Sequence, residues 1–156
     1  MVSVMVSRSK TVSSTSHNIL LVDDNRSGLR ARQSVLEELG FSTDGVSEAR
    51  KALELFKSKQ YDLVVTDYKM PGMDGVEFIA RLREVEPQVP VILISGFVEA
   101  LGLSESTTGA NVVIMKCANE VQHLIRAATR LLKPAKRPPL IEKSLLSRTR
   151  KKATGA

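Results

Sequence analysis

Acidic and polar side chains follow four apolar segments of this sequence, each at the point where the segment ends. Two aspartates follow the run NILLV at residues 18–22, and a third follows YDLVVT at residues 61–66. A serine follows VPVILI, and a lysine follows the last apolar run. These residues are Asp23, Asp24, Asp67, Ser95 and Lys116. If the four segments are strands of one parallel sheet, their carboxyl ends bring all five side chains to the same edge.

Such a set of side chains could carry out phosphoryl transfer. Three neighbouring carboxylates repel one another, and a divalent cation such as Mg²⁺ relieves that repulsion while also binding phosphate oxygens. Lys116 supplies a cation for an anionic group, and Ser95 supplies a hydroxyl donor. Asp67 is then the candidate nucleophile, and the product would be an aspartyl phosphate. Asp and Ser also follow strands because they begin turns and cap helices, but their presence at successive strand ends favours a site.

The segments around these residues alternate between strand and helix patterns. Short apolar runs predict strands at residues 18–22, 41–46, 61–66, 89–94 and 111–115. Apolar residues at helical spacing predict helices at residues 26–39, after a capping Ser47, from residue 76 up to Pro87, and at residues 120–132. Residues 97–108 contain Gly102 and a SESTTG run, so any helix there should be short or loose.

Strands that alternate with helices predict an α/β fold with a parallel sheet. The almost wholly apolar strands fit a sheet that is covered on both faces. Five strands favour the flavodoxin-like, doubly wound sheet in the order 2-1-3-4-5, with helices on both faces.

Charge is distributed unevenly along the 156 residues. Residues 134–156 contain seven Lys/Arg and one Glu, whereas residues 17–132 contain 13 basic and 16 acidic residues. We therefore expect a disordered leader at residues 1–16, a folded domain at residues 17–133, and a flexible, basic, proline-containing tail at residues 134–156 with no attached output domain. One cysteine allows no internal disulfide, and no apolar run reaches the ~20 residues that span a bilayer, so we expect a cytoplasmic protein without membrane contact.

Over residues 17–132 the sequence resembles the response-regulator receiver family of two-component signalling. The resemblance rests on NILLVDDN at residues 18–25, DLVVTD at 62–67, MPGMDG at 70–75, ISG at 94–96, and Lys116. It implies that Asp67 is the phosphoacceptor, that Ser95 binds a phosphoryl oxygen, and that Lys116 pairs with the phosphoryl group. It also implies that Mg²⁺ or Mn²⁺ is held by Asp23, Asp24, Asp67 and the backbone carbonyl of Lys69, with Asp24 a more direct ligand than Asp23.

The resemblance further implies a single-domain response regulator. Its phosphoryl donor would be a histidine kinase or a phosphotransfer protein, and it would signal by binding a downstream protein that the sequence does not identify. It would be a switch that catalyses only its own phosphorylation and dephosphorylation, not a turnover enzyme. We expect a monomer or weak dimer, and no nucleic-acid partner beyond non-specific contact through the basic tail.

Two residues depart from the family pattern. Cys117 stands where the family usually has a proline after the lysine, commonly in a cis bond, and Val113 stands where it often has an aromatic switch residue. Both changes bear on how the signal is transmitted.

Three alternative functions have weaker support. A pseudo-receiver that works without phosphorylation would not need the complete set of site residues. A phosphohydrolase with an aspartate nucleophile would have a second aspartate where Lys69 stands. A DNA-binding regulator acting through residues 134–156 would need aromatic residues or a recognition helix there.

Overall fold

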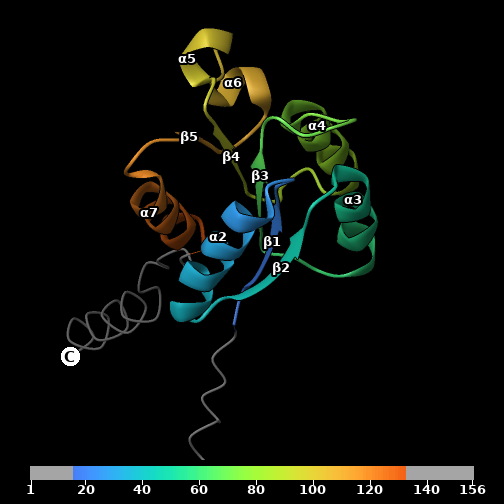
Figure 1. Ribbon diagram of the computed structural model, residues 1–156. Helices are drawn as coiled ribbons and strands as arrows, with labels where there is room; N and C mark the ends of the chain where they lie inside the picture. Colours follow the sequence, from blue (N-terminus) through green and yellow to red (C-terminus); the bar gives the residue numbers. More distant parts are fainter. Residues whose placement is uncertain (1–15, 133–156) are drawn as a thin grey trace, which may run out of the picture.

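Five parallel strands form one sheet in the computed structural model, which describes residues 16–132. Figure 1 shows how the helices surround this sheet. The order β2-β1-β3-β4-β5 confirms the predicted topology. The strands are β1 (Asn18–Val22), β2 (Ser42–Val46), β3 (Leu63–Asp67), β4 (Val91–Ser95) and β5 (Val112–Met115). The predicted basic tail lies outside the described residues, as does the predicted leader apart from its last residue.

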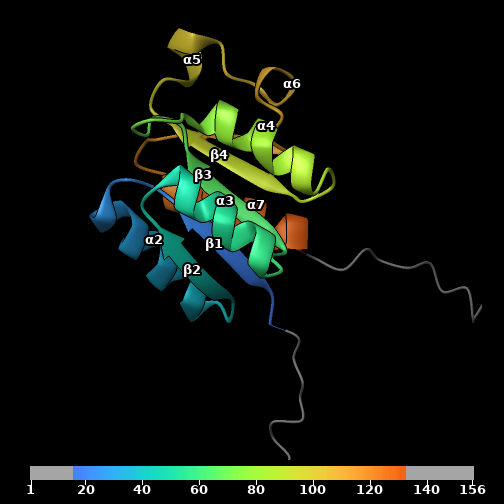
Figure 2. The ribbon, with the colours of Figure 1, turned by 90° about the vertical axis from the view of Figure 1, so that its right-hand side faces the viewer.

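The long helices cover the sheet in pairs, one pair on each face. Helices α3 (Ala49–Ser58) and α4 (Gly75–Val85) lie on one face, and α2 (Arg26–Glu38) and α7 (Glu120–Leu132) lie on the other (Figures 1 and 2). This double cover explains why every residue of β3 and β4 is buried.

Alternate residues of each central strand face opposite cores. Leu20 and Val64 contribute to the core beneath α3 and α4, whereas Leu21 and Val65 contribute to the core beneath α2 and α7. Each fully buried aliphatic side chain stabilises the fold by about 1.5–3 kcal/mol relative to its exposed state. The sheet that carries the candidate site is therefore held from both sides.

Residues 97–108 form two single-turn helices, as their composition predicted. These helices are α5 (Val98–Leu101) and α6 (Glu105–Thr108). The C-caps Gly102 and Gly109 have φ values of 63° and 83°, in the left-handed region that favours glycine. Each helix therefore stops after one turn.

The start of α3 differs from the prediction that Ser47 caps it. The N-cap is Glu48, and its side chain makes no capping hydrogen bond. The helix instead begins at Ala49, the first residue of the apolar stripe that packs on the core. Packing, rather than capping chemistry, sets this helix start.

Candidate functional site

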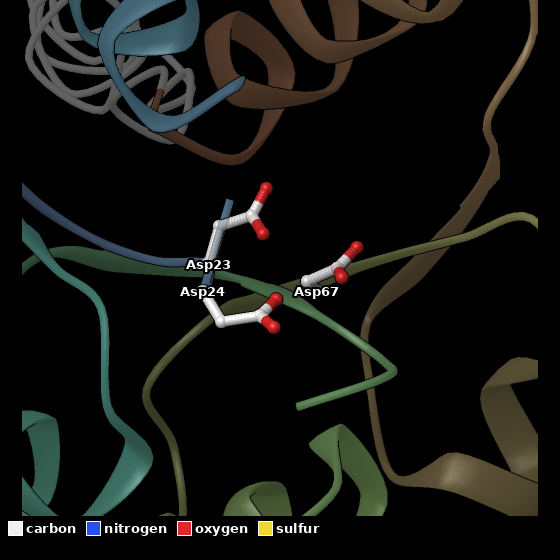
Figure 3. A group of neighbouring side chains, drawn as sticks. All are labelled: Asp23, Asp24 and Asp67. Atoms are coloured by element: carbon white, nitrogen blue, oxygen red, sulfur yellow. The ribbon is translucent and has the colours of Figure 1, made fainter. Parts of the chain in front are cut away.

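The three aspartates predicted to form a site lie together at the carboxyl edge of the sheet (Figure 3). Asp67 is the last residue of β3, while Asp23 and Asp24 directly follow β1. Since β1 and β3 are paired neighbours, with Val22 opposite Thr66, the ends of these two strands are adjacent. One carboxylate oxygen from each aspartate lies within 4.8 Å of the others.

Asp67 is a buried carboxylate, with only 4% of its surface exposed. Its Oδ1 lies 2.7 Å from Nζ of Lys116, but this buried atom accepts no hydrogen bond of ordinary geometry from the described residues, so the contact is an ion pair. Burial raises the pKa of Asp67, as does the charge of Asp23, and both outweigh the lowering by Lys116 and Arg32. The ionised form of Asp67 is therefore poorly stabilised by the protein, and a further cation nearby would stabilise it.

The two aspartates after β1 differ in their surroundings. Asp23 is 1% exposed; its Oδ1 accepts the backbone N–H of Asn25 at 2.9 Å, and its Oδ2 accepts a bond from Nη1 of Arg32 at 2.6 Å. The Asp24 side chain is exposed. Asp23 is thus already bound by protein groups on both oxygens, whereas Asp24 faces solvent.

Ser95 and Lys116 come from the ends of the next two strands. Ser95 closes β4, and Lys116 follows β5. The backbone carbonyl of Ser95 accepts the N–H of Lys116 at 2.9 Å, and Oγ of Ser95 accepts the N–H of Phe97 at 2.9 Å. Ser95 therefore helps to place the backbone of Lys116.

A hollow of about 480 Å³ opens beside the carboxylates. Its lining comes from the ends of β1 and β3 and from the loops after β3, β4 and β5. The lining residues include Asp23, Asp24, Asp67, Lys69, Phe97 and Lys116. Four of the five residues predicted from the strand ends thus line this hollow together with Lys69. The fifth, Ser95, is not part of the lining, but it ends β4 directly before Gly96, which is.

The loop after Asp67 is held tightly against the end of β3. The N–H of Gly75 donates to the carbonyl of Tyr68 at 2.6 Å, and a Cβ at position 75 would lie 2.5 Å from the carbonyl oxygen of Asp67. Asp74 caps α4 by accepting from the N–H groups of Val76 and Glu77, each at 2.9 Å. This close approach requires glycine and holds the loop that carries Lys69 beside the carboxylates.

The residues present fit a magnesium ion. Mg²⁺ prefers oxygen ligands and usually takes one or two carboxylates together with water and phosphate oxygens. Asp67 has a buried oxygen without an ordinary hydrogen bond, Asp24 is exposed beside it, and the three carboxylates lie close enough to share one ion. A divalent cation here would offset both the repulsion among the aspartates and the cost of burying Asp67.

Arg32 contacts the site but was not among the residues predicted from the sequence. This residue of α2 is 6% exposed, and besides Asp23 it contacts Glu120, whose Oε2 lies 2.8 Å from both Nε and Nη2. A signal was available, because position 32 shares a helix face with the buried Leu29 and Leu36. A charged residue on an apolar helix face needs a buried partner.

Cys117 and Val113, the two residues that depart from the family pattern, both lie outside the hollow. Cys117 is exposed, and no peptide bond in the described part of the chain is cis. Val113, in β5, is partly buried and packs against the core beneath α3 and α4. Neither residue contributes to the lining of the hollow.

Comparison with known proteins agrees with this geometry. The family model described as the response regulator receiver domain matches residues 19–129. The transcriptional regulatory protein YesN of Bacillus subtilis is 35% identical over 131 residues, covering 81% of this chain and 35% of YesN. The chain thus spans about a third of the length of that relative, and less of several others.

Solved structures show the same fold. The response regulator TrrA of Thermotoga maritima, solved in complex with Mg²⁺–BeF, is 28% identical, with a TM-score of 0.68 over 74% of this chain and 99% of TrrA. The receiver domain of the sensor histidine kinase PA1611 of Pseudomonas aeruginosa, solved with magnesium in its active-site cleft, has a TM-score of 0.69 at 23% identity. This match covers 77% of this chain and all of that domain. Within residues 16–132, no helix is long and apolar enough to cross a membrane.

Proposed function

The chain belongs to the response regulator receiver domain family of two-component systems, and from this premise we propose that Asp67 is its phosphoacceptor. One observation carries the proposal: a buried carboxylate at the end of β3 is paired with Lys116 and lies beside two further aspartates. Burial also raises the pKa of Asp67, and its buried Oδ1 accepts no hydrogen bond of ordinary geometry from the described residues.

The reaction that follows is transfer of a phosphoryl group from a phosphohistidine of a histidine kinase or phosphotransfer protein. A carboxylate oxygen of Asp67 forms the new O–P bond while the N–P bond of the phosphohistidine breaks, and the released histidine nitrogen keeps its electron pair and takes up a proton. Lys116 provides positive charge for the phosphoryl oxygens, and the hydroxyl of Ser95 provides a donor once it turns from the N–H of Phe97.

Asp24, Asp67 and the backbone carbonyl of Lys69 would hold Mg²⁺, or Mn²⁺ in its place, with Asp23 acting through water. Both carboxylate oxygens of Asp23 already accept hydrogen bonds from protein groups, which supports an indirect role for Asp23 in metal binding. When bound, the ion neutralises the carboxylates and lets an anionic donor approach. The net negative charge of the aspartates would then no longer repel the phosphoryl group as it approaches Asp67.

The output of the switch is binding of a downstream protein in a phosphorylation-dependent way. The chain would catalyse only its own phosphorylation and dephosphorylation, in which water cleaves the aspartyl phosphate and inorganic phosphate leaves, and it would act as a switch, not as a turnover enzyme. The basic residues at positions 134–156 would increase the rate of encounter with an acidic partner, an effect that falls with ionic strength.

The test uses a small phosphodonor such as acetyl phosphate and the intact mass of the protein. Wild type should gain one phosphoryl group in Mg²⁺ and none in EDTA, while Asp67→Asn should gain none in either. Asp62→Asn is a matched control, because Asp62 is exposed and lies just before β3, at the opposite end from Asp67. Equal labelling of wild type and Asp67→Asn would show that the nucleophile is another residue.

A further inference from the structure

Arg32 occupies an unusual place, because its guanidinium joins the acidic site to the beginning of α7. Nη1 donates to Oδ2 of Asp23 at 2.6 Å, while Nε and Nη2 both lie 2.8 Å from Oε2 of Glu120. Glu120 is the first residue of α7, whereas Arg32 belongs to α2. A single planar cation therefore bridges two carboxylates from different parts of the chain.

The bridge is shielded from solvent on the side of the acidic site. The side chains of Arg32 and Asp23 are 7% and 2% exposed, and that of Glu120 is 18% exposed. Charges in such surroundings interact more strongly than surface pairs, and loss of one partner leaves another charge uncompensated. The strength of each half of the bridge must therefore depend on the other.

The connection between β5 and α7 is held to the acidic site at both of its ends. At its start, Lys116 pairs with Asp67; at its end, Glu120 is held by Arg32 and so by Asp23. The N–H of Glu120 also donates to the carbonyl of Cys117 at 3.0 Å, which closes this short segment. A change of charge among the aspartates thus acts on both ends of one segment.

We propose that Arg32 is a positioning residue that couples the charge of the acidic site to the first turn of α7 through Asp23 and Glu120. A cation beside Asp23 competes with Arg32 for that carboxylate and shifts the guanidinium towards Glu120. Coupling between two sites is reciprocal, so the charge of Glu120 must in turn affect cation binding at the aspartates. The inference rests on the proposed function only in taking Mg²⁺ as the cation.

The direction of the effect follows from the charges. Glu120→Gln leaves the guanidinium with Asp23 as its single carboxylate partner, so the Arg32–Asp23 pair becomes stronger and the site less negative. The Mg²⁺ affinity should fall by about three- to tenfold, the range expected for residues of one charge network. With Arg32→Met, the link is lost, and Glu120→Gln should then change the affinity by less than about twofold.

The test is a double-mutant cycle on Mg²⁺ affinity, measured by calorimetric titration of the full chain. It compares wild type, Arg32→Met, Glu120→Gln and the double variant. Arg30→Met and Glu38→Gln are matched controls, since both positions are exposed on α2, and neither should alter the affinity. Arg32→Lys provides a second background that keeps the charge but cannot span both carboxylates, so the cycle remains informative if Arg32→Met fails to fold.

A second measurement separates coupling from a structural role. Amide hydrogen exchange in the first turn of α7 should change when Mg²⁺ is added to wild type and should not change with Glu120→Gln. Equal effects of Glu120→Gln in the wild-type and Arg32-substituted backgrounds would overturn this inference while leaving the proposed function intact. Failure of wild type to bind Mg²⁺ would overturn both, and the labelling of Asp67 would fail with it.

Discussion

Nζ of Lys116 lies 2.7 Å from Oδ1 of Asp67, although β3, which ends at Asp67, and β5, which Lys116 follows, are separated in the sheet by β4. The lysine reaches across the end of β4 to a carboxylate that is otherwise poorly satisfied. The cation needed for an incoming phosphoryl group is thus in place before any donor arrives. Lys116 also keeps the pKa of Asp67 from rising further.

Replacement of Lys116 should therefore change the titration of Asp67. Lys116→Met removes the largest of the influences that lower this pKa, so the metal-free pKa should rise and the carboxylate should become protonated at higher pH than in wild type. The carboxyl ¹³C chemical shift of Asp67, followed against pH in EDTA, measures this. Lys57→Met, at an exposed position of α3, is the control and should leave the curve unchanged. A downward or absent shift with Lys116→Met would contradict the assigned ion pair.

Magnesium should stabilise the folded chain through Asp24. A ligand that binds only the native state at 100 times its dissociation constant stabilises that state by about 2.7 kcal/mol. Asp24→Asn should reduce the Mg²⁺-dependent rise in melting temperature, and in EDTA it should melt no lower than wild type because it removes one repelling charge. Thermal melts with and without Mg²⁺ provide the measurement, with Glu38→Gln as control. An undiminished Mg²⁺ shift in Asp24→Asn would exclude Asp24 as a ligand.

A larger residue at position 75 should destabilise the fold. A Cβ there would lie 2.5 Å from the carbonyl oxygen of Asp67 and 2.8 Å from Cδ1 of Leu93, both in the core of the sheet. Gly75→Ala should lower the free energy of unfolding by about 1–3 kcal/mol, as overpacking of a core does. Gly96→Ala is the comparison for stability, because a Cβ at position 96 would meet nothing within 4 Å. Denaturant unfolding measures both variants, and equal losses would show that the close approach is unimportant.

Removal of residues 134–156 should leave phosphoryl transfer unchanged. All five strands and every residue proposed for the site lie within residues 16–132. The intact mass after acetyl phosphate treatment should show the same extent of labelling for the shortened chain and the full chain. Binding to an acidic partner should weaken and lose part of its salt dependence. If the shortened chain folds but is no longer labelled, residues 134–156 are needed for phosphorylation of Asp67.

The order of the strands and the position of the aspartates were predictable from the pattern of residues alone. Buried strands in a doubly covered sheet are mostly apolar, so β1, β3 and β4 are recognisable in the sequence as short, almost wholly apolar runs that end in polar residues. The parallel arrangement then places Asp23, Asp24 and Asp67 at one edge, whatever the details of packing. This part of the prediction needed only hydrophobic periodicity and the family motifs.

Contacts between side chains that are distant in sequence depend on how the helices and strands pack together. Periodicity shows that position 32 faces inward, but not that Arg32 reaches both Asp23 and Glu120, because that depends on how α2 and α7 lie on the same face of the sheet. The start of α3 at Ala49 and the close approach of Gly75 to Asp67 depend in the same way on packing against the core. Such distances depend on the packing of several helices and strands at once, so they cannot be predicted from any single segment of the sequence.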